Sequence, residues 1–167
     1  MTTINLNDEQ WDFDRKQPGY DMKRRAVGAA LGGELLGASL FELQPGQRAW
    51  PYHTHYGNEE MLIVLAGTPT LRTPDGEQEL RAGDTAIHRR GPAGFHQMIN
   101  QSDEPARFLV ISTMLEPDVV QWEDSDKLVV FAGAAPQPGV HAPIQLSFRR
   151  EAAIPFWEGE SPPEAES

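Results

Sequence analysis

Short runs in which apolar and polar residues alternate recur along the chain, with glycine- and proline-rich segments between them. A period of two is typical of strands that bury one face. The pattern predicts strands over residues 34–43, 61–65, 70–73, 77–81, 85–88, 96–100, 108–113, 128–131 and 145–149. An all-β chain of this length must close or double its sheet to protect the edge strands, and a jelly roll or small barrel is therefore expected.

The two ends of the chain differ from this pattern. Asn7 is a favourable N-cap and Asp8 and Glu9 follow it, so a short helix, or else an arm, is expected over residues 7–13. Residues 158–167 carry four glutamates, two prolines and no basic residue, which predicts a mobile acidic tail. No repeat or linker divides the remainder, and residues 1–157 are expected to form one domain.

Composition narrows the class of protein. Of the 167 residues, 39% are apolar, which is enough for a core that needs no disulfide or metal to fold. The longest apolar run covers only residues 61–66, far short of the roughly 20 that cross a bilayer. The first residues have neither the basic start nor the apolar centre of a secretory signal, so a cytoplasmic location is expected.

The charge of the chain excludes several partners. Lysine and arginine number 14 against 25 aspartates and glutamates, a formal net charge of -11. Such a surface repels phosphate backbones and anionic lipids, so neither nucleic acid nor a membrane is expected as a partner. The chain has no cysteine, which excludes thiolate catalysis and cysteine-based metal sites.

Histidines are the residues that point to chemistry. His53 and His55 are two positions apart, so on a strand both imidazoles face the same side. If Leu62 and Val64 face inward in the next strand, Glu60 faces inward with them. A buried carboxylate is costly unless a cation lies beside it, and a metal ion held by the two histidines would supply one.

A third imidazole is available from His96, which follows a turn rich in glycine and proline. Three histidines and one glutamate form a mixed nitrogen and oxygen site, and one divalent transition metal per chain (Mn, Fe, Ni or Zn) is expected. Two alternatives stay open: the histidines could be exposed loop residues, and Glu59 could bind in place of Glu60.

These residues resemble the first motif of the cupin superfamily, G-x5-H-x-H-x3,4-E-x6-G. The chain has Gly46, His53, His55, Glu60 and Gly67 in that order, with a first spacer of six residues where the motif has five. The other spacings match.

The second cupin motif, G-x5-P-x-G-x2-H-x3-N, is similar to the segment from Gly83 to Asn100. Arg89 replaces the proline, and four residues rather than two separate Gly91 from His96. The two motifs together span residues 46–100. The chain from residue 111 on also looks like small single-domain bacterial cupins, many of them labelled sugar-phosphate-isomerase-like or uncharacterised.

The resemblance implies a double-stranded β-helix with His53, His55, Glu60 and His96 as metal ligands. It also implies a homodimer that exchanges N-terminal strands, for which residues 35–41 are the candidate. The activity implied is that of a metal-dependent enzyme acting on a small oxygenated metabolite, such as a sugar or sugar phosphate isomerase or epimerase. An Fe(II) dioxygenase and a non-catalytic module that binds a small molecule or metal are the alternatives.

Other residues could line or surround the site. A phosphate-bearing substrate would need an arginine clamp. His88 is expected in the barrel wall or at the surface and His141 in a loop, with a role in the site as the alternative for each. Trp50 and Tyr52 are expected in a pocket, in the core or at a dimer contact, and Asn100 in a turn. The candidate arginines for the clamp are Arg48, Arg72, Arg89 and Arg90. No catalytic residue and no organic cofactor site are assigned.

Overall fold

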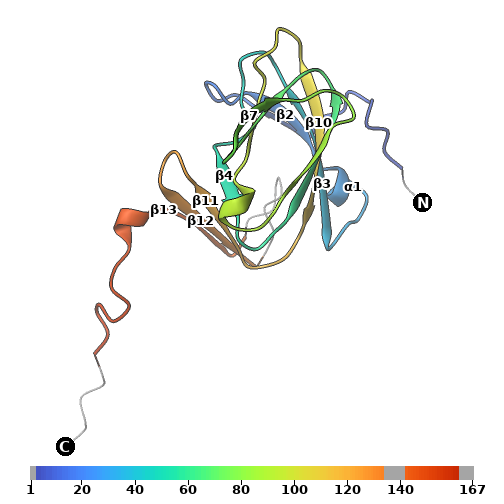
Figure 1. Cartoon of the computed structure of the whole chain (residues 1–167). Coiled ribbons are helices and arrows are strands. Elements are labelled where there is room, and N and C mark those ends of the chain that lie inside the picture. The colour runs from blue at the N-terminus through green and yellow to red at the C-terminus, as the bar shows by residue number, and fades with distance from the viewer. Residues whose placement is uncertain (1–2, 134–141, 162–167) are drawn as a thin grey trace, which may run out of the picture.

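The computed structural model describes residues 3–133 and 142–161. One wall of the molecule is a sheet of six antiparallel strands, and β3 and β10 lie at its centre (Figure 1). In spatial order the strands are β1 (Phe13–Arg15), β2 (Met22–Arg25), β3 (Leu36–Leu43), β10 (Ala106–Thr113), β5 (Glu60–Ala66) and β8 (Thr85–His88).

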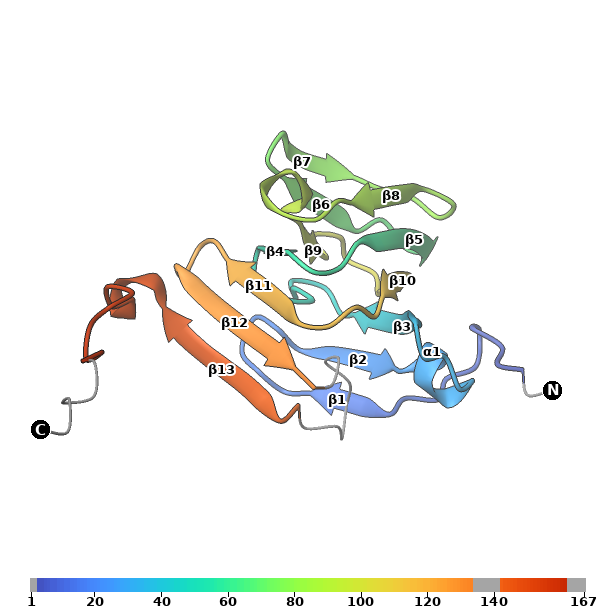
Figure 2. The same ribbon diagram turned by 90° about the horizontal axis from the view of Figure 1, so that it is seen from below.

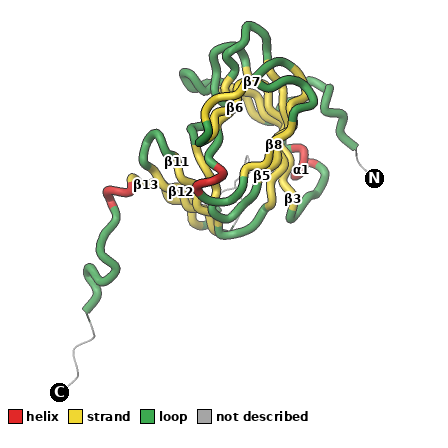
Figure 3. Tube along the Cα trace, viewed as in Figure 1, coloured by secondary structure: helices red, strands yellow, loops and turns green. Residues whose placement is uncertain are grey.

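The opposite wall consists of two smaller sheets. One has the order β13 (Ile144–Arg149), β12 (Lys127–Ala132), β11 (Asp118–Trp122) and β4 (His53–His55). The other has the order β7 (Gly76–Glu79), β6 (Thr70–Thr73) and β9 (Gln97–Ile99). A bridge between His53 and His96 joins the two sheets. Strands therefore surround the centre of the molecule, as Figure 3 shows.

Three short helical segments complete the described chain. They are α1 (Val27–Ala30) and two single 3₁₀ turns, η1 (Pro92–Gly94) and η2 (Arg150–Ala152). In Figure 2 the strands form a stack, and the segment after β13 leaves the barrel. Residues 158–161 are exposed, and the rest of the acidic tail lies outside the described residues, so its mobility stays a prediction.

The all-β prediction is confirmed, and each of the nine predicted strands is present with bounds shifted by up to two residues. The helix over residues 7–13 does not form, and that segment is the arm that was the alternative. The Asn5 side chain accepts the backbone N–H of Asn7 and the Asn5 carbonyl accepts that of Asp8, so the chain forms a turn where the helix was expected to begin.

Strand alternation divides the apolar residues into two clusters. Inside the barrel, Leu62 and Val64 of β5 pack with Phe108 of β10, whose ring stacks on Phe41 with centroids 5.3 Å apart. On the outer side of the same sheet, Leu40 packs with apolar residues of the N-terminal arm and of α1. Glu60 lies two residues before Leu62 on the same strand, so it faces the interior, as the alternation predicts.

Part of the segment expected at the dimer contact is buried in the outer cluster of its own chain. Leu40 is 0% exposed and packs against Val27 and Leu109 of its own chain. β3 pairs with β10 along its whole length and with β2 at residues 40–42, so around Leu40 it has no free edge to exchange with a second copy. Of the candidate segment, residues 35–36 remain exposed. The homodimer itself stays a prediction.

The described residues include no helix long and apolar enough to cross a membrane. The cytoplasmic location stays a prediction.

Candidate metal centre

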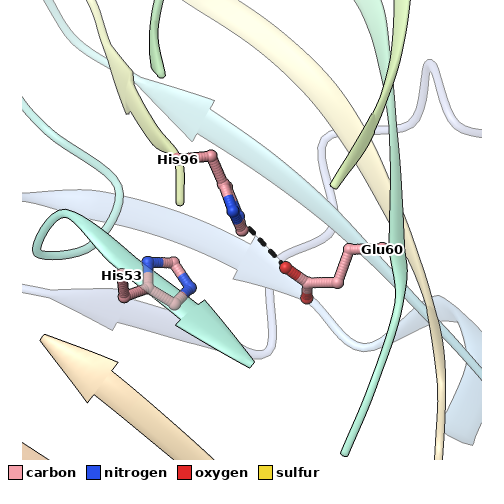
Figure 4. Close-up of side chains that lie close together, drawn as sticks. All are labelled: His53, Glu60 and His96. Atoms are coloured by element: carbon pink, nitrogen blue, oxygen red, sulfur yellow. Dashed lines mark ion pairs between the residues drawn. The ribbon is translucent and has the colours of Figure 1, made fainter. Parts of the chain in front are cut away.

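His53, Glu60 and His96 come from three separate segments and converge inside the barrel, as Figure 4 shows. Each offers one ligand atom, and these atoms lie within 4.8 Å of one another. His96 Nε2 lies 3.1 Å from Glu60 Oε2. The structure thus brings together three of the four residues that the sequence proposed as ligands, on β4, on β5 and just before β9.

The fourth residue, His55, adjoins the cluster. Its ring lies 5.1 Å from that of His53, and its Nε2 atom lies 3.7 Å from Glu60 Oε2. On its other side, His55 Nδ1 donates to Asp118 Oδ2 at 2.6 Å. Asp118 is 2% exposed and also accepts the backbone N–H of Gly57. The carboxylate therefore fixes the orientation of the His55 ring.

The other two imidazoles are oriented by backbone carbonyls. His53 Nδ1 lies 2.8 Å from the carbonyl oxygen of Pro51, and His96 Nδ1 lies 2.9 Å from that of Gly94. A carbonyl can only accept, so each Nδ1 carries a proton, and Nε2 is the atom that each ring turns toward the cluster. In a neutral ring this Nε2 has the free lone pair that a metal ion requires.

The turn before His96 explains why the second motif is longer than usual. The additional residues form η1, which places the Gly94 carbonyl beneath the His96 ring. A Cβ atom at Gly94 would lie 1.6 Å from the carbonyl oxygen of Arg89, so no other residue fits there.

Burial and charge set the protonation of the cluster. Burial by itself raises the pKa of Glu60, but the hydrogen bond with His96 and the nearby imidazoles outweigh it and hold that pKa well below its usual value. Burial lowers the pKa of His53 well below 6.5, so this imidazole is neutral at pH 7. Burial also disfavours the charged form of His55, but Asp118 and Glu60 outweigh it and raise its pKa.

This arrangement fits a metal ion. An ionised carboxylate and the Nε2 atoms of the imidazoles face one another in a buried space, where they need a cation between them, either a proton on an imidazole or a metal ion. Nitrogen and oxygen donors of this kind suit first-row transition metals. The residues could therefore hold a metal ion, and they do not determine which one.

Glu59 lies on the other face of the strand. Its side chain is exposed, and its backbone N–H donates to Thr113 Oγ1 at 3.0 Å. The structure thus places Glu60 in the cluster and Glu59 outside it. Which carboxylate binds the metal stays a prediction.

His88 lies in the barrel wall beside the cluster. Its ring stacks on that of His96, with centroids 3.8 Å apart and planes 8° apart, and it pairs with Glu60 across β8 and β5. Among the described residues its buried Nε2 atom has no hydrogen-bond partner. Burial, with a smaller effect from the neighbouring His96, lowers the pKa of His88 to about 3, so the His88 ring is neutral at pH 7.

A cavity of about 540 Å³ opens on one side of this cluster. Its volume is in the range of small-molecule sites. Trp50 lines it, whereas Tyr52 packs against Phe95 and beneath the Arg72 guanidinium outside it. The apolar part of the lining includes Leu36, Phe41, Trp50, Met98, Phe108, Val110, Val120, Trp122, Val129 and Phe131.

The arginines proposed as a phosphate clamp do not reach the cavity. Arg48, Arg89 and Arg90 are exposed, and Arg72 forms a bidentate ion pair with Asp124. The lining contains Arg24 instead.

Sequence reasoning missed both Arg24 and Asp118. The available signal was alternation: Arg24 shares a strand face with the buried Met22, and Asp118 shares one with Val120. Strands β2 and β11 are too short for that signal to stand out.

Asn100 is fully buried and donates to the carbonyls of Leu43 and Glu104, which confirms its role in a turn. His141 lies outside the described residues.

Comparison with known proteins supports the fold. The family model of the cupin domain matches residues 39–112. No curated protein matches the chain.

Solved structures that are similar to the chain include the following three. A sugar phosphate isomerase of the cupin superfamily from Silicibacter pomeroyi has 23% identity and a TM-score of 0.76, covering 94% of this chain and 98% of that one. A protein from Acidithiobacillus ferrooxidans, provisionally named a sugar phosphate isomerase, has 24% identity, a TM-score of 0.70 and 83% coverage of both chains. The polyketide cyclase RemF from Streptomyces resistomycificus has 23% identity and a TM-score of 0.56, covering 68% of this chain and 79% of that one. At these identities the likeness concerns the fold, and the predicted double-stranded β-helix is confirmed.

Proposed function

Because the chain is a small cupin-fold protein, we propose that it is a metal-dependent enzyme that acts on a small oxygenated metabolite inside its barrel. One observation carries this proposal. The ligand atoms of His53, Glu60 and His96 converge at the wall of a cavity of about 540 Å³ and not in a closed core. A purely structural metal site is closed, whereas a catalytic one keeps a position open to the substrate.

The chemistry follows from the residues that would surround the metal. A divalent ion bound here supplies Lewis-acid polarisation of a carbonyl or hydroxyl oxygen. Asp118 holds the Nδ1 proton of His55, so that Nε2 of this ring faces the cluster. The apolar lining excludes water, which strengthens electrostatic interactions in the cavity.

His88 has a different part in this proposal. With a pKa of about 3 its ring is too weak a base to take a proton from a carbon acid at pH 7. Its Nε2 atom is buried, whereas the residue lines the cavity. We therefore assign His88 to shaping the cavity wall beside the substrate.

The proposed reaction type is isomerisation or epimerisation. Two similar structures bear the name sugar phosphate isomerase, which suggests proton transfer beside a carbonyl. A phosphate on the substrate has less support, because the arginines that would clamp it lie away from the cavity. The same donor set with Fe(II) would serve a dioxygenase, and this alternative is distinguished by the experiment below.

The test uses the protein loaded in turn with Mn, Fe, Ni and Zn. Each form is incubated in D₂O with a panel of small aldehydes, ketones, hydroxy acids and oxo acids, and deuterium at the carbon beside the carbonyl is followed by proton NMR. The proposal expects exchange that a His53→Ala, His96→Ala double variant lacks. Oxygen consumption with the iron form alone would favour the dioxygenase, and binding without exchange or turnover would favour a non-catalytic module.

We also propose that the chain forms a homodimer. Leu35 is 74% exposed at the start of the candidate segment, and a second copy would cover it. The contact is expected at this end of the segment, since Leu40 is covered within the chain.

A further inference from the structure

Arg24 lies in the wall of the cavity, on the short strand β2. In register it stands between Phe13 of β1 and Phe41 of β3, and all three residues line the cavity. Met22, two positions earlier, packs in the inner core, so alternation sends the Arg24 side chain to the inner face as well. Among the described lining residues it is the one arginine, and there is no lysine.

The Arg24 side chain is held in place from two sides. Its Nε atom donates to Ser39 Oγ at 3.0 Å. The guanidinium carbon lies 5.8 Å from the centre of the Phe41 ring, a distance at which the ring face attracts a cation. The side chain is therefore oriented before any ligand arrives.

The charge of Arg24 is not neutralised by an ion pair. Over residues 3–133 and 142–161, no acidic side chain pairs with it and its two Nη atoms have no hydrogen-bond partner. Burial lowers the pKa of Arg24, and the negative charges of Glu60 and Asp12 only partly offset this effect. Since a guanidinium stays protonated in proteins, the cavity wall carries an unpaired cation.

The other charges of the cavity limit what this cation can bind. Glu60 and Asp118 are the acidic residues of the described lining, and Asp118 is already bonded to His55. With a divalent ion bound, one guanidinium and two carboxylates leave the site with one net positive charge. A carboxylate ligand neutralises that charge, whereas a phosphate monoester carries about −1.5 to −2 at pH 7 and exceeds it.

We propose that Arg24 binds a carboxylate group of the substrate through its two Nη atoms, so that the ligand is a carboxylic acid with an apolar or aromatic body. A planar carboxylate matches the guanidinium fork bidentately. The apolar lining, with Phe41, Trp50 and Phe108 among its residues, suits such a body. This inference rests on the proposed function, because it names the substrate class of the same cavity.

The experiment compares three probes of one shape by isothermal titration calorimetry: phenylacetate, the neutral isostere 2-phenylacetamide, and phenyl phosphate. The metal-loaded protein is expected to bind phenylacetate about 10-fold or more tightly than the amide. Arg24→Gln should remove this preference, Arg24→Lys should keep part of it, and Arg72→Gln, which changes an arginine outside the cavity, should keep all of it.

The same titrations on chelated, dialysed protein separate Arg24 from the metal. A preference for phenylacetate that survives without metal and disappears in Arg24→Gln assigns the carboxylate to Arg24. A preference that needs metal but survives in Arg24→Gln overturns the inference, as does tighter binding of phenyl phosphate or no binding of phenylacetate. Failure of the deuterium exchange experiment would leave the binding preference intact, so the two proposals fail separately.

Discussion

His53 and His96 bond to each other through their backbones in both directions. The N–H of His96 donates to the His53 carbonyl at 2.8 Å, and the N–H of His53 donates to the His96 carbonyl at 3.1 Å. This pair joins β4 to the segment before β9, so the two imidazoles are brought together by the sheet itself. The site therefore exists before a metal binds.

Removal of the metal should accordingly leave the protein folded. The inner and outer clusters are built from apolar residues that do not include the ligands. Metal then adds stability only by mass action, about 2.7 kcal/mol when free metal is a hundredfold above its Kd. Urea unfolding with and without a chelator measures the difference. A collapse of the β-sheet circular dichroism signal on chelation would show that the metal holds the fold together.

Asp118→Asn should weaken metal binding without unfolding the protein. The amide can no longer hold the His55 ring as an anion does, and such changes beside a ligand cost about 10- to 100-fold in metal affinity. A competition titration with a chelator of known affinity gives the two Kd values. Asp75→Asn, in the exposed turn between β6 and β7, is the matched control. Equal affinity of parent and Asp118→Asn would remove Asp118 from the site.

The stability of the protein should fall in acid partly through Glu42. Burial raises the pKa of Glu42, but hydrogen bonds from Arg107 and Lys23 outweigh it, and the pKa lies below its usual value. A lowered pKa means that the contribution is present above about pH 4.3, the unfolded value, and is lost as the pH falls through the folded value.

Glu42→Gln should therefore lower the free energy of unfolding by about 1–2 kcal/mol at pH 7. Below both pKa values the parent carboxyl is protonated too, so the two proteins should converge. Urea unfolding at a series of pH values between about 7 and 3 tests this. A difference that stays constant over the whole series would mean that the charge of Glu42 does not matter.

Leu40→Asp should destroy the fold and not only a dimer. The side chain is fully buried against its own chain, and an unpaired charge there is among the most destabilising changes possible. Leu35→Asp, at an exposed position on the same segment, should stay folded and yield a monomer. Sedimentation velocity distinguishes an unfolded chain, a folded monomer and a dimer. A parent protein that sediments as a monomer contradicts the proposed homodimer.

Alternation predicted the position of Glu60 because β5, with seven residues, is long enough to show a period. Leu62 and Val64 of β5 place Glu60 inside, and the structure has it there. The same reasoning did not reach Arg24 or Asp118, since β2 and β11 have four and five residues and begin with no clear pattern. The contact between His55 and Asp118 also depends on the pairing of β4 with β11, which is a long-range property.

The helix predicted over residues 7–13 from its capping residues does not form. Asn7 and the acidic residues after it are favourable at the start of a helix, but the arm is fixed by Ile4, Leu6 and Trp11, which pack on the outer cluster. Tertiary packing outweighs a helix of that length, because isolated short helices are marginal in water.

The metal content of the purified protein tests the central claim most directly. The parent, a His53→Ala, His96→Ala double variant, Glu60→Gln and Glu59→Gln are equilibrated with the same metals, dialysed, and analysed by elemental mass spectrometry. Parent and Glu59→Gln should retain about one ion per chain, the double variant should retain none, and Glu60→Gln should retain much less than the parent. Retention by the double variant equal to that of the parent would contradict the assignment of this site.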